Sequence, residues 1–212
     1  MAEGRALLRA LKRAAGGADP APCLPVGNPV LALLRPVGVR RERIHPADVT
    51  ALTEWRNRFP QSFLTEFEAT EARTLTWLTE AVAADDGKIL FMADGLDRRS
   101  FGYLGLDAID WERGSGEADA VVRGGDGPAG AMALGLTALL RWARGSLGLS
   151  EITVRVLADN PALAFYGRVG FVEQRRVALR REVRGPGEVA WVEDASTTAP
   201  ERSLVYLQWE PA

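Results

Sequence analysis

Hydrophobic residues recur along the chain with two different spacings, and these spacings predict which segments are helices and which are strands. Apolar positions three to four residues apart predict amphipathic helices in residues 2–15, 46–59, 75–82, 132–143 and 161–169. Extended or alternating apolar runs predict strands in residues 30–36, 39–44, 88–93, 101–109, 116–123, 151–157, 171–183 and 203–209. The segment 16–29 is rich in glycine and proline and is predicted to be a linker.

The order of these elements predicts the class of fold. Helices precede an antiparallel meander of three strands, one helix then joins two strands as a βαβ crossover, and a hairpin closes the chain. We therefore expect an α+β fold with a mixed, mostly antiparallel sheet flanked by helices. An N-terminal helix and linker are expected in residues 1–28, and one domain in residues 29–212.

Composition excludes several classes of protein. Hydrophobic residues make up 47% and charged residues 25% of the 212 residues, which is the balance of a folded globular protein. The formal net charge of −2 provides no broad basic field for nucleic-acid phosphates, and the longest apolar stretch, Val30 to Leu34, is too short to span a bilayer. The single cysteine, Cys23, allows no internal disulfide and no paired-cysteine metal site. We therefore expect a cytoplasmic protein without nucleic-acid partner, membrane partner or bound metal.

The most informative local feature is a glycine-rich turn between the predicted strand 116–123 and the helix after it. Residues 121–131 read Val-Val-Arg-Gly-Gly-Asp-Gly-Pro-Ala-Gly-Ala. Glycines let the backbone approach a ligand closely, and the following helix directs its free N–H groups and positive dipole end at the turn. Arg123 adds a positive charge beside it. The turn is therefore predicted to bind a phosphate or pyrophosphate.

One interpretation of this turn is a dinucleotide site. Gly125, Gly127 and Gly130 match the G-x-G-x-x-G pattern, and Asp159 ends the next predicted strand, as a ribose-binding acid does. The distance from Gly125 to Asp159 is longer than that pattern requires, and only two predicted strands follow, which leaves no second half for a nicotinamide. An oxidoreductase is therefore the weaker alternative.

The sequence after the turn favours a different interpretation. The run Val-Leu-Ala-Asp-Asn at 156–160 is followed by Tyr166 and by Gly-Phe at 170–171. With the turn, these motifs resemble the GNAT superfamily over residues 30–180. In that superfamily a glycine-rich turn binds the CoA pyrophosphate, the next strand splays away to admit the pantetheine, and an Asn, a Tyr and a Gly-Phe mark the next short helix. The turn here is longer than the family's, and Asn160 lies one residue too close to Tyr166, so Asp159 and Asn160 both remain candidates for the Asn position.

The resemblance implies acetyl-CoA as co-substrate and assigns residues to it. The backbone N–H groups near Val121 and Val122 are expected to polarise the thioester carbonyl, and Tyr166 to donate a proton to the departing sulfur. The full set expected to contact the co-substrate is Val121, Val122, Arg123, Gly125, Gly127, Gly130, Ala131 and Asn160.

A general base for the acceptor amine is sought on the strand before the turn. Alternation in a strand places Glu117, Asp119, Val121 and Arg123 on one face. Asp119 and Glu117 are therefore the candidate bases, with Asp119 preferred. The single histidine, His45, precedes Pro46 at a helix start and is interpreted as a cap or surface residue.

The acceptor is expected to bind the region of the first two helices of the domain. Trp55, Arg56 and Asn57 resemble a run in GNAT members that acetylate nucleotide-linked amino sugars, and in others that acetylate ribosomal-protein N-termini. In the alternative, Trp55 packs in the core while the other two end the helix. We therefore predict an N-acetyltransferase acting on a small-molecule primary amine, with a nucleotide-linked amino sugar as candidate. A protein N-terminal acetyltransferase and a non-catalytic acyl-CoA-binding module are the alternatives, and a homodimer is a further expectation.

Overall fold

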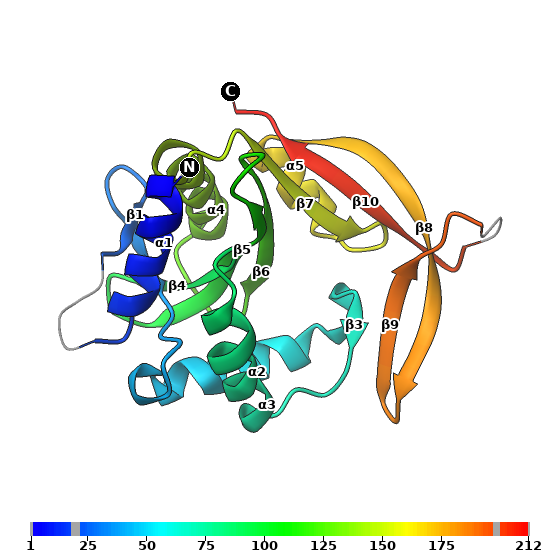
Figure 1. Ribbon diagram of the computed structural model, residues 1–212, viewed down its shortest axis with the longest axis horizontal. Coiled ribbons are helices and arrows are strands. Elements are labelled where there is room, and N and C mark those ends of the chain that lie inside the picture. The colour runs from blue at the N-terminus through cyan, green and yellow to red at the C-terminus, as the bar shows by residue number, and fades with distance from the viewer. Residues whose placement is uncertain (1, 18–21, 197–199, 212) are drawn as a thin grey trace.

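The computed structural model describes residues 2–17, 22–196 and 200–211 (Figure 1). The helices are α1 (Ala2–Ala14), α2 (Pro46–Arg58), α3 (Glu71–Thr76), α4 (Ala131–Trp142) and α5 (Leu163–Val169). Single π-helical segments, Trp77–Val82 and Ala143–Leu147, prolong α3 and α4, and short 3-10 helices cover Arg41–Arg43 and Pro60–Ser62. The strands are β1 (Leu24–Val26), β2 (Ala32–Pro36), β3 (Thr65–Glu66), β4 (Ile89–Gly95), β5 (Ser100–Asp110), β6 (Ser115–Arg123), β7 (Glu151–Leu157), β8 (Phe171–Gly185), β9 (Glu188–Glu193) and β10 (Arg202–Trp209). None of the helices in these ranges is long and apolar enough to cross a bilayer.

All these strands belong to one sheet, in the order β1-β2-β4-β5-β6-β7-β10-β8-β9-β3. Within the described chain β6 and β7 are the one parallel pair, and α4 joins them as the crossover. The other neighbouring pairs are antiparallel. The structure therefore confirms the predicted α+β fold with a mixed, mostly antiparallel sheet and one βαβ crossover.

Helices cover both faces of the sheet. On β4, Phe91 packs into the cluster that contains α1, α4 and α5, while Leu90 and Met92 pack into the cluster that contains α2 and the π-helical segment after α3. This is the alternation expected of a strand buried on both sides. Leu8 of α1 is fully buried in the first cluster, so the N-terminal helix shares the core of the rest of the chain.

Three short strands and one 3-10 helix differ from the sequence prediction. The predicted linker contains β1, which pairs with β2, and the prediction also missed β3 and β9. The strand predicted at 39–44 is wrong, since Arg41–Arg43 form a 3-10 helix. A Cβ on Gly38 would lie 2.3 Å from the carbonyl oxygen of Arg43, so the chain folds back on itself here as no extended strand can.

The parallel pair separates along its length. The paired residues of β6 and β7 are Ser115 with Glu151, Gly116 with Ile152 and Glu117 with Thr153. Beyond them β6 continues to Arg123 and β7 to Leu157 without further pairing to each other, so a gap opens between the two strands. The expected splay is therefore present in the structure.

The end of β8 and β9 form a hairpin beside this gap, which we call the arm. The first part of β8 pairs with β10 and its end pairs with β9. β9 in turn pairs with β3, in the segment that follows α2, through Thr65 with Ala190 and Glu66 with Val189. Figure 1 shows this arm on the right of the molecule, with β3 beside β9. The segment after α2 is thus attached both to its own helix and to the arm.

Candidate active site

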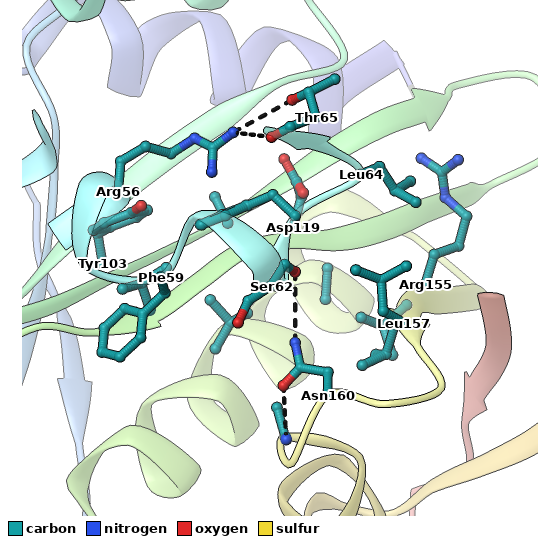
Figure 2. A pocket seen from close by; sticks show the side chains of 18 of the residues that line it. Arg56, Phe59, Ser62, Leu64, Thr65, Tyr103, Asp119, Arg155, Leu157 and Asn160 are labelled. Carbon is teal, nitrogen blue, oxygen red and sulfur yellow. Dashed lines mark hydrogen bonds between the residues drawn. The ribbon is translucent and has the colours of Figure 1, made fainter. Parts of the chain in front are cut away.

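A cavity of about 720 Å³ lies where β6 and β7 separate (Figure 2). One wall comes from α2 and from residues 59–69, which we call the roof. Another wall comes from the parts of β6 and β7 that no longer pair with each other and from the start of α5.

A β-bulge in β6 shapes this wall. Tyr103 of β5 pairs with Val122, and Gly105 with Asp119, so three steps along β6 oppose two along β5. Ala120 takes up the extra residue with a φ of 54°, a left-handed conformation that costs a non-glycine residue about 1–2 kcal/mol. Such strain persists only where the surrounding structure fixes it, and it is common next to functional sites.

The bulge exchanges the faces of the residues that follow it. Val121 packs against the cluster on the α4 side, whereas Ala120 and Val122 pack against the cluster on the α2 side. The predicted common face of Glu117, Asp119, Val121 and Arg123 is therefore wrong, because the extra residue interrupts the alternation. Arg123 is exposed to solvent.

Asp119 lies on the cavity wall without a cationic partner. No lysine or arginine nitrogen within the described chain lies within 4 Å of its carboxylate. Burial is the main cause that raises the pKa of Asp119 above its usual value, and the nearby charge of Asp107 raises it further. A carboxylate with a raised pKa is a stronger base than an ordinary aspartate.

Glu117, the other candidate base, is already paired. Its carboxylate accepts hydrogen bonds from Nε of Arg155 at 2.9 and 2.8 Å. Burial raises the pKa of Glu117, and the hydrogen bond from Arg155 opposes that rise. Abstracting a proton at Glu117 would weaken this ion pair, so Asp119 remains the preferred base.

Tyr166 is held rigidly at the far side of the cavity. Its side chain is 7% exposed, and its ring makes edge contacts with Phe165 and Phe171 at centroid distances of 5.3 and 5.7 Å. Within the described ranges its hydroxyl forms no hydrogen bond, and the residue lines the cavity. Burial raises the pKa of Tyr166, followed by the charges of Asp119 and Glu117. The hydroxyl is therefore protonated at neutral pH and free to donate.

Tyr103 is a second cavity tyrosine, which the sequence analysis missed. It stacks on Trp55 with the ring centroids 6.2 Å apart and the planes 5° from parallel. Burial also raises the pKa of Tyr103. In the sequence it resembles any aromatic residue of a buried strand, so nothing there marks it as part of a site.

The structure separates the two candidates for the Asn position. Asn160 lines the cavity, and its Oδ1 accepts a hydrogen bond of 2.9 Å from the backbone N–H of Ala162 where α5 begins. Asp159 instead forms an ion pair with Arg202 at 2.8 Å. Asn160 therefore occupies the cavity wall, and Asp159 does not.

Two glycines of the phosphate-binding turn have a packing role. A Cβ on Gly124 would lie 1.9 Å from the ring of Trp55, and one on Gly127 would lie 2.4 Å from the ring of Phe101. The absence of a side chain at these positions is explained by the two aromatic rings. Gly127, which was predicted to contact the ligand, thus lies against the ring of Phe101.

The open part of the turn is at its end, where α4 begins. Gly130 has a φ of 74° and no neighbouring atom within 4 Å of the position a Cβ would take. It precedes Ala131, and no side chain caps the helix. Gly125 accepts a hydrogen bond of 3.4 Å from Nε of Arg123, which places this exposed guanidinium beside the turn. An uncapped helix start with an open approach fits the pyrophosphate of a CoA molecule whose pantetheine enters the gap between β6 and β7.

The three residues predicted to bind the acceptor have different positions. Arg56 lines the cavity. Trp55 is buried between Tyr103 and the turn, and Asn57 exchanges hydrogen bonds of 2.9 and 2.8 Å with the backbone of Ala69. Trp55 and Asn57 are not among the described residues that line the cavity, and they act by fixing its walls.

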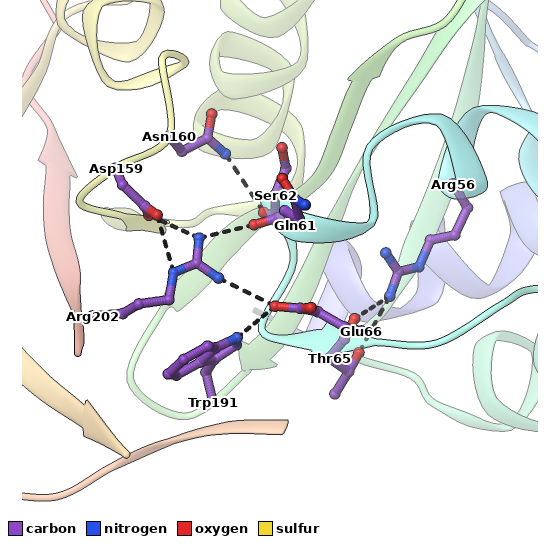
Figure 3. Close-up of polar contacts among 9 residues, drawn as sticks. All are labelled: Arg56, Gln61, Ser62, Thr65, Glu66, Asp159, Asn160, Trp191 and Arg202. Carbon is purple, nitrogen blue, oxygen red and sulfur yellow. Dashed lines mark hydrogen bonds and ion pairs between the residues drawn. The ribbon is translucent and has the colours of Figure 1, made fainter. Parts of the chain in front are cut away.

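A polar network holds the roof in place (Figure 3). Arg202 of β10 donates to the carbonyl oxygen of Gln61 at 2.9 Å and contacts the carboxylates of Glu66 at 3.4 Å and Asp159 at 2.8 Å. Trp191 of β9 donates to Glu66 at 2.6 Å. The roof is thereby connected to β10, to the arm and to the turn before α5.

In the described ranges no three His, Cys, Asp or Glu side chains are placed to hold a metal ion.

Comparison with known proteins identifies the family. The model of the acetyltransferase (GNAT) domain matches residues 40–172, more than half of the chain. A probable GNAT-family acetyltransferase from Chromobacterium violaceum superposes with a TM-score of 0.64 at 19% identity, over 92% of this chain and 88% of that one. The spermidine N-acetyltransferase of Vibrio cholerae, in complex with CoA and spermine, gives a TM-score of 0.64 at 16% identity, over 84% of this chain and 94% of that one. No curated protein sequence matches.

The chain therefore belongs to the GNAT acetyltransferase family. It is an acetyltransferase that takes its acetyl group from acetyl-CoA and transfers it to an amine. The low identities of the solved structures show a common fold and do not define the acceptor.

Proposed function

We propose that the chain acetylates the primary amine of a small molecule bound in the cavity between the roof and β6. The observation that carries this proposal is the placement of Asp119 and Tyr166 on one cavity at the gap between β6 and β7. Asp119 has no cationic partner, and Tyr166 has no hydrogen-bond acceptor, within the described chain. A base and an acid that are free to exchange protons are what acetyl transfer requires.

The reaction forms one bond and breaks another. The amine nitrogen attacks the thioester carbonyl carbon, and Asp119 accepts the proton that the nitrogen loses, directly or through water. The carbon–sulfur bond then breaks, and Tyr166 donates a proton to the departing thiolate. The products are the acetylated amine and CoA with a free thiol, and solvent returns Asp119 and Tyr166 to their starting states.

The charges of the two residues couple these steps. Burial, followed by the negative charge of Asp119, raises the pKa of Tyr166 in the resting protein. When Asp119 takes the amine proton, this charge is neutralised and the pKa of Tyr166 falls. Tyr166 thus becomes a better acid at the stage when the thiolate leaves.

The free edge of β6 supports the developing oxyanion. Its edge toward β7 has no strand partner after Glu117, so backbone N–H groups that point this way are not used by the sheet. We assign this role to the N–H groups near Val121 and Val122, beside the bulge. A donor positioned for the oxyanion contributes about 3–4 kcal/mol to lowering the barrier.

The cavity beside the roof favours a small molecule as the acceptor. Residues 59–69 form one wall of the cavity and are held by Arg202, Asn57 and the pairing of β3 with β9. A cavity of about 720 Å³ has the size of a small-molecule site. A nucleotide-linked amino sugar remains our candidate acceptor.

The test is a panel of primary amines that contains nucleotide-linked amino sugars, short peptides and polyamines. Release of free CoA thiol is followed with and without each amine, and the acetylated product is identified by mass. Thiol release that requires a small amine supports the proposal. Acetylation of peptides alone would replace it with the protein N-terminal alternative.

A further inference from the structure

The cavity that receives the acceptor carries more positive than negative charge. Among the described residues, two acidic ones line it, Glu117 and Asp119. Five cationic residues of the same ranges line it: Arg56, Arg73, Lys88, Arg123 and Arg155. A polycation such as spermidine would need the opposite balance, because each of its charges requires a compensating carboxylate when water is removed.

Most of these cations already have partners. Arg155 is paired with Glu117 at 2.8 Å, Lys88 with Asp107 at 2.6 Å, and Arg73 with Glu188 at 3.3 Å. Arg123 is exposed at the phosphate-binding turn. Arg56 is the cavity-lining cation that is partly buried and has no carboxylate within 4 Å in the described ranges.

Arg56 is fixed in position by contacts that leave donors unused. Its Nη2 donates to the carbonyl oxygen of Thr65 at 2.5 Å, and its guanidinium lies over the rings of Phe63 at 3.6 Å and Phe67 at 4.6 Å. Nη1 is buried and has no hydrogen-bond partner, and Nε forms none within the described chain. A guanidinium with buried, unpaired donors is costly unless a ligand satisfies it.

Burial adds to this cost. It lowers the pKa of Arg56, and the charge of Arg73 lowers it further, while Tyr103 and Asp119 oppose the effect. An anion bound beside the guanidinium would supply the missing charge.

We propose that Arg56 binds an anionic group, a carboxylate or a phosphate, carried by the acceptor amine itself. This inference rests on the proposed function and adds the charge class of the substrate to it. Arg56 and Asp119 line the same cavity, Arg56 from α2 and Asp119 from β6 (Figure 2). The acceptor is oriented between them, with its amine toward Asp119 and its anionic group toward Arg56.

The experiment measures binding of matched amines by titration calorimetry to protein saturated with CoA, so that no turnover occurs. One pair is glucosamine 6-phosphate and glucosamine, which differ by a phosphate. The other is L-methionine and L-methioninamide, which differ in the charge of the carboxyl group. Spermidine is the cationic probe.

Two variants separate Arg56 from the general charge of the cavity. Arg56→Met keeps an apolar stem and removes the charge. Arg73→Met removes a cation from the same cavity that already has Glu188 as its partner. Arg56→Lys is a third variant, which keeps the charge but loses the planar fork.

In the wild type, the anionic member of at least one pair should bind at least about tenfold more tightly than its neutral partner. This ratio should fall to about one in Arg56→Met, fall partway in Arg56→Lys, and persist in Arg73→Met. The pair that shows the preference identifies carboxylate or phosphate as the group. A retained rise of the melting temperature with acetyl-CoA shows that a variant is folded, and if Arg56→Met fails this check, Arg56→Lys carries the comparison.

Ratios of about one in both pairs, tightest binding by spermidine, or an unchanged ratio in the Arg56 variants would overturn the inference. Thiol release tests the proposed function separately. Anion preference without acetylation of any amine would support the anion site and contradict the enzyme. Acetylation of amines without anion preference would do the reverse.

Discussion

Asp119 and Tyr166 line one cavity, and burial, followed by the charge of Asp119, raises the pKa of Tyr166. They come from different elements, β6 and α5, and approach the gap between β6 and β7 from its two sides. We propose that this pair forms the proton path of the acetyltransferase.

Replacing Asp119 by asparagine should lower kcat/KM by on the order of 10²-fold or more, because the base is lost while the shape of the side chain is kept. In the wild type, kcat/KM should rise with pH as Asp119 deprotonates, at a pKa above its ordinary value of 3.8. This rise should disappear in Asp119→Asn, while the titration of the amine, at about pH 10, remains. The measurement is the pH profile of kcat/KM.

Asp119→Asn, although it lowers activity, should not lower the stability of the fold. Because the pKa of Asp119 is raised by folding, the native state binds the proton more tightly than the unfolded chain does. The wild type therefore loses stability as pH rises from 3.8 through the raised pKa, and Asp119→Asn does not. Its melting temperature at pH 7 should equal or exceed that of the wild type. Glu117→Gln is the control, which should keep the pH profile because this carboxylate is already paired with Arg155 and is not the base.

Tyr166→Phe should keep acetyl-CoA binding and lower kcat by on the order of 10²-fold, because the ring stays packed and only the proton donor is removed. Tyr103→Phe removes a hydroxyl from the same cavity and should have a much smaller effect. Single-turnover kinetics with saturating acetyl-CoA measure the chemical step in both variants. Equal losses, or normal turnover in Tyr166→Phe, would remove the general-acid role.

Gly130→Asp and Gly130→Asn test the phosphate-binding turn with a matched pair. Asparagine and aspartate both tolerate the left-handed conformation of this position, and apart from its chain neighbours no atom of the described residues lies within 4 Å of the new Cβ. The two variants therefore differ in charge alone. Aspartate should weaken acetyl-CoA binding at least about tenfold relative to asparagine, by repulsion of the phosphates at the start of α4. Equal affinities by calorimetry would place the pyrophosphate elsewhere.

Arg202→Met tests the network that holds the roof. The side chain is 13% exposed and contacts Gln61, Glu66 and Asp159, so its loss should lower the free energy of unfolding by about 1–3 kcal/mol. KM for the amine should rise more than kcat falls, because the roof forms the acceptor wall and not the proton path. Arg176→Met removes an exposed ion pair with Glu173 and should change neither. An unchanged KM in Arg202→Met would separate the roof from acceptor binding.

The sequence predicted those elements that have strong periodicity and deep burial. The helix around Leu136 and the strand around Phe91 have apolar residues at the spacing of a helix and of a buried strand, so their own sequences predict them. β3 has two residues, and it is a strand because β9 lies beside it. Such an element is defined by tertiary contact and leaves no periodic signal.

In the site, too, the sequence predicted the residues that belong to local motifs and missed those that depend on tertiary contacts. Tyr166 and the turn were predicted from sequence motifs, and Tyr166 lines the cavity in the structure. The bulge was missed because Ala120 carries no turn signature, and its conformation is imposed by the neighbouring strand. The roof network was missed because Glu66 and Arg202 are 136 positions apart, and nothing in either segment specifies the other.

The most direct test of the central claim is acetyl-CoA-dependent thiol release in the presence of primary amines, measured with wild-type protein and with Tyr166→Phe. Our account predicts release that requires both acetyl-CoA and an amine, an acetylated product confirmed by mass, and a rate reduced by on the order of 10²-fold in the variant. Tight acetyl-CoA binding without thiol release for any amine would contradict it, and would identify the chain as a non-catalytic acyl-CoA-binding module.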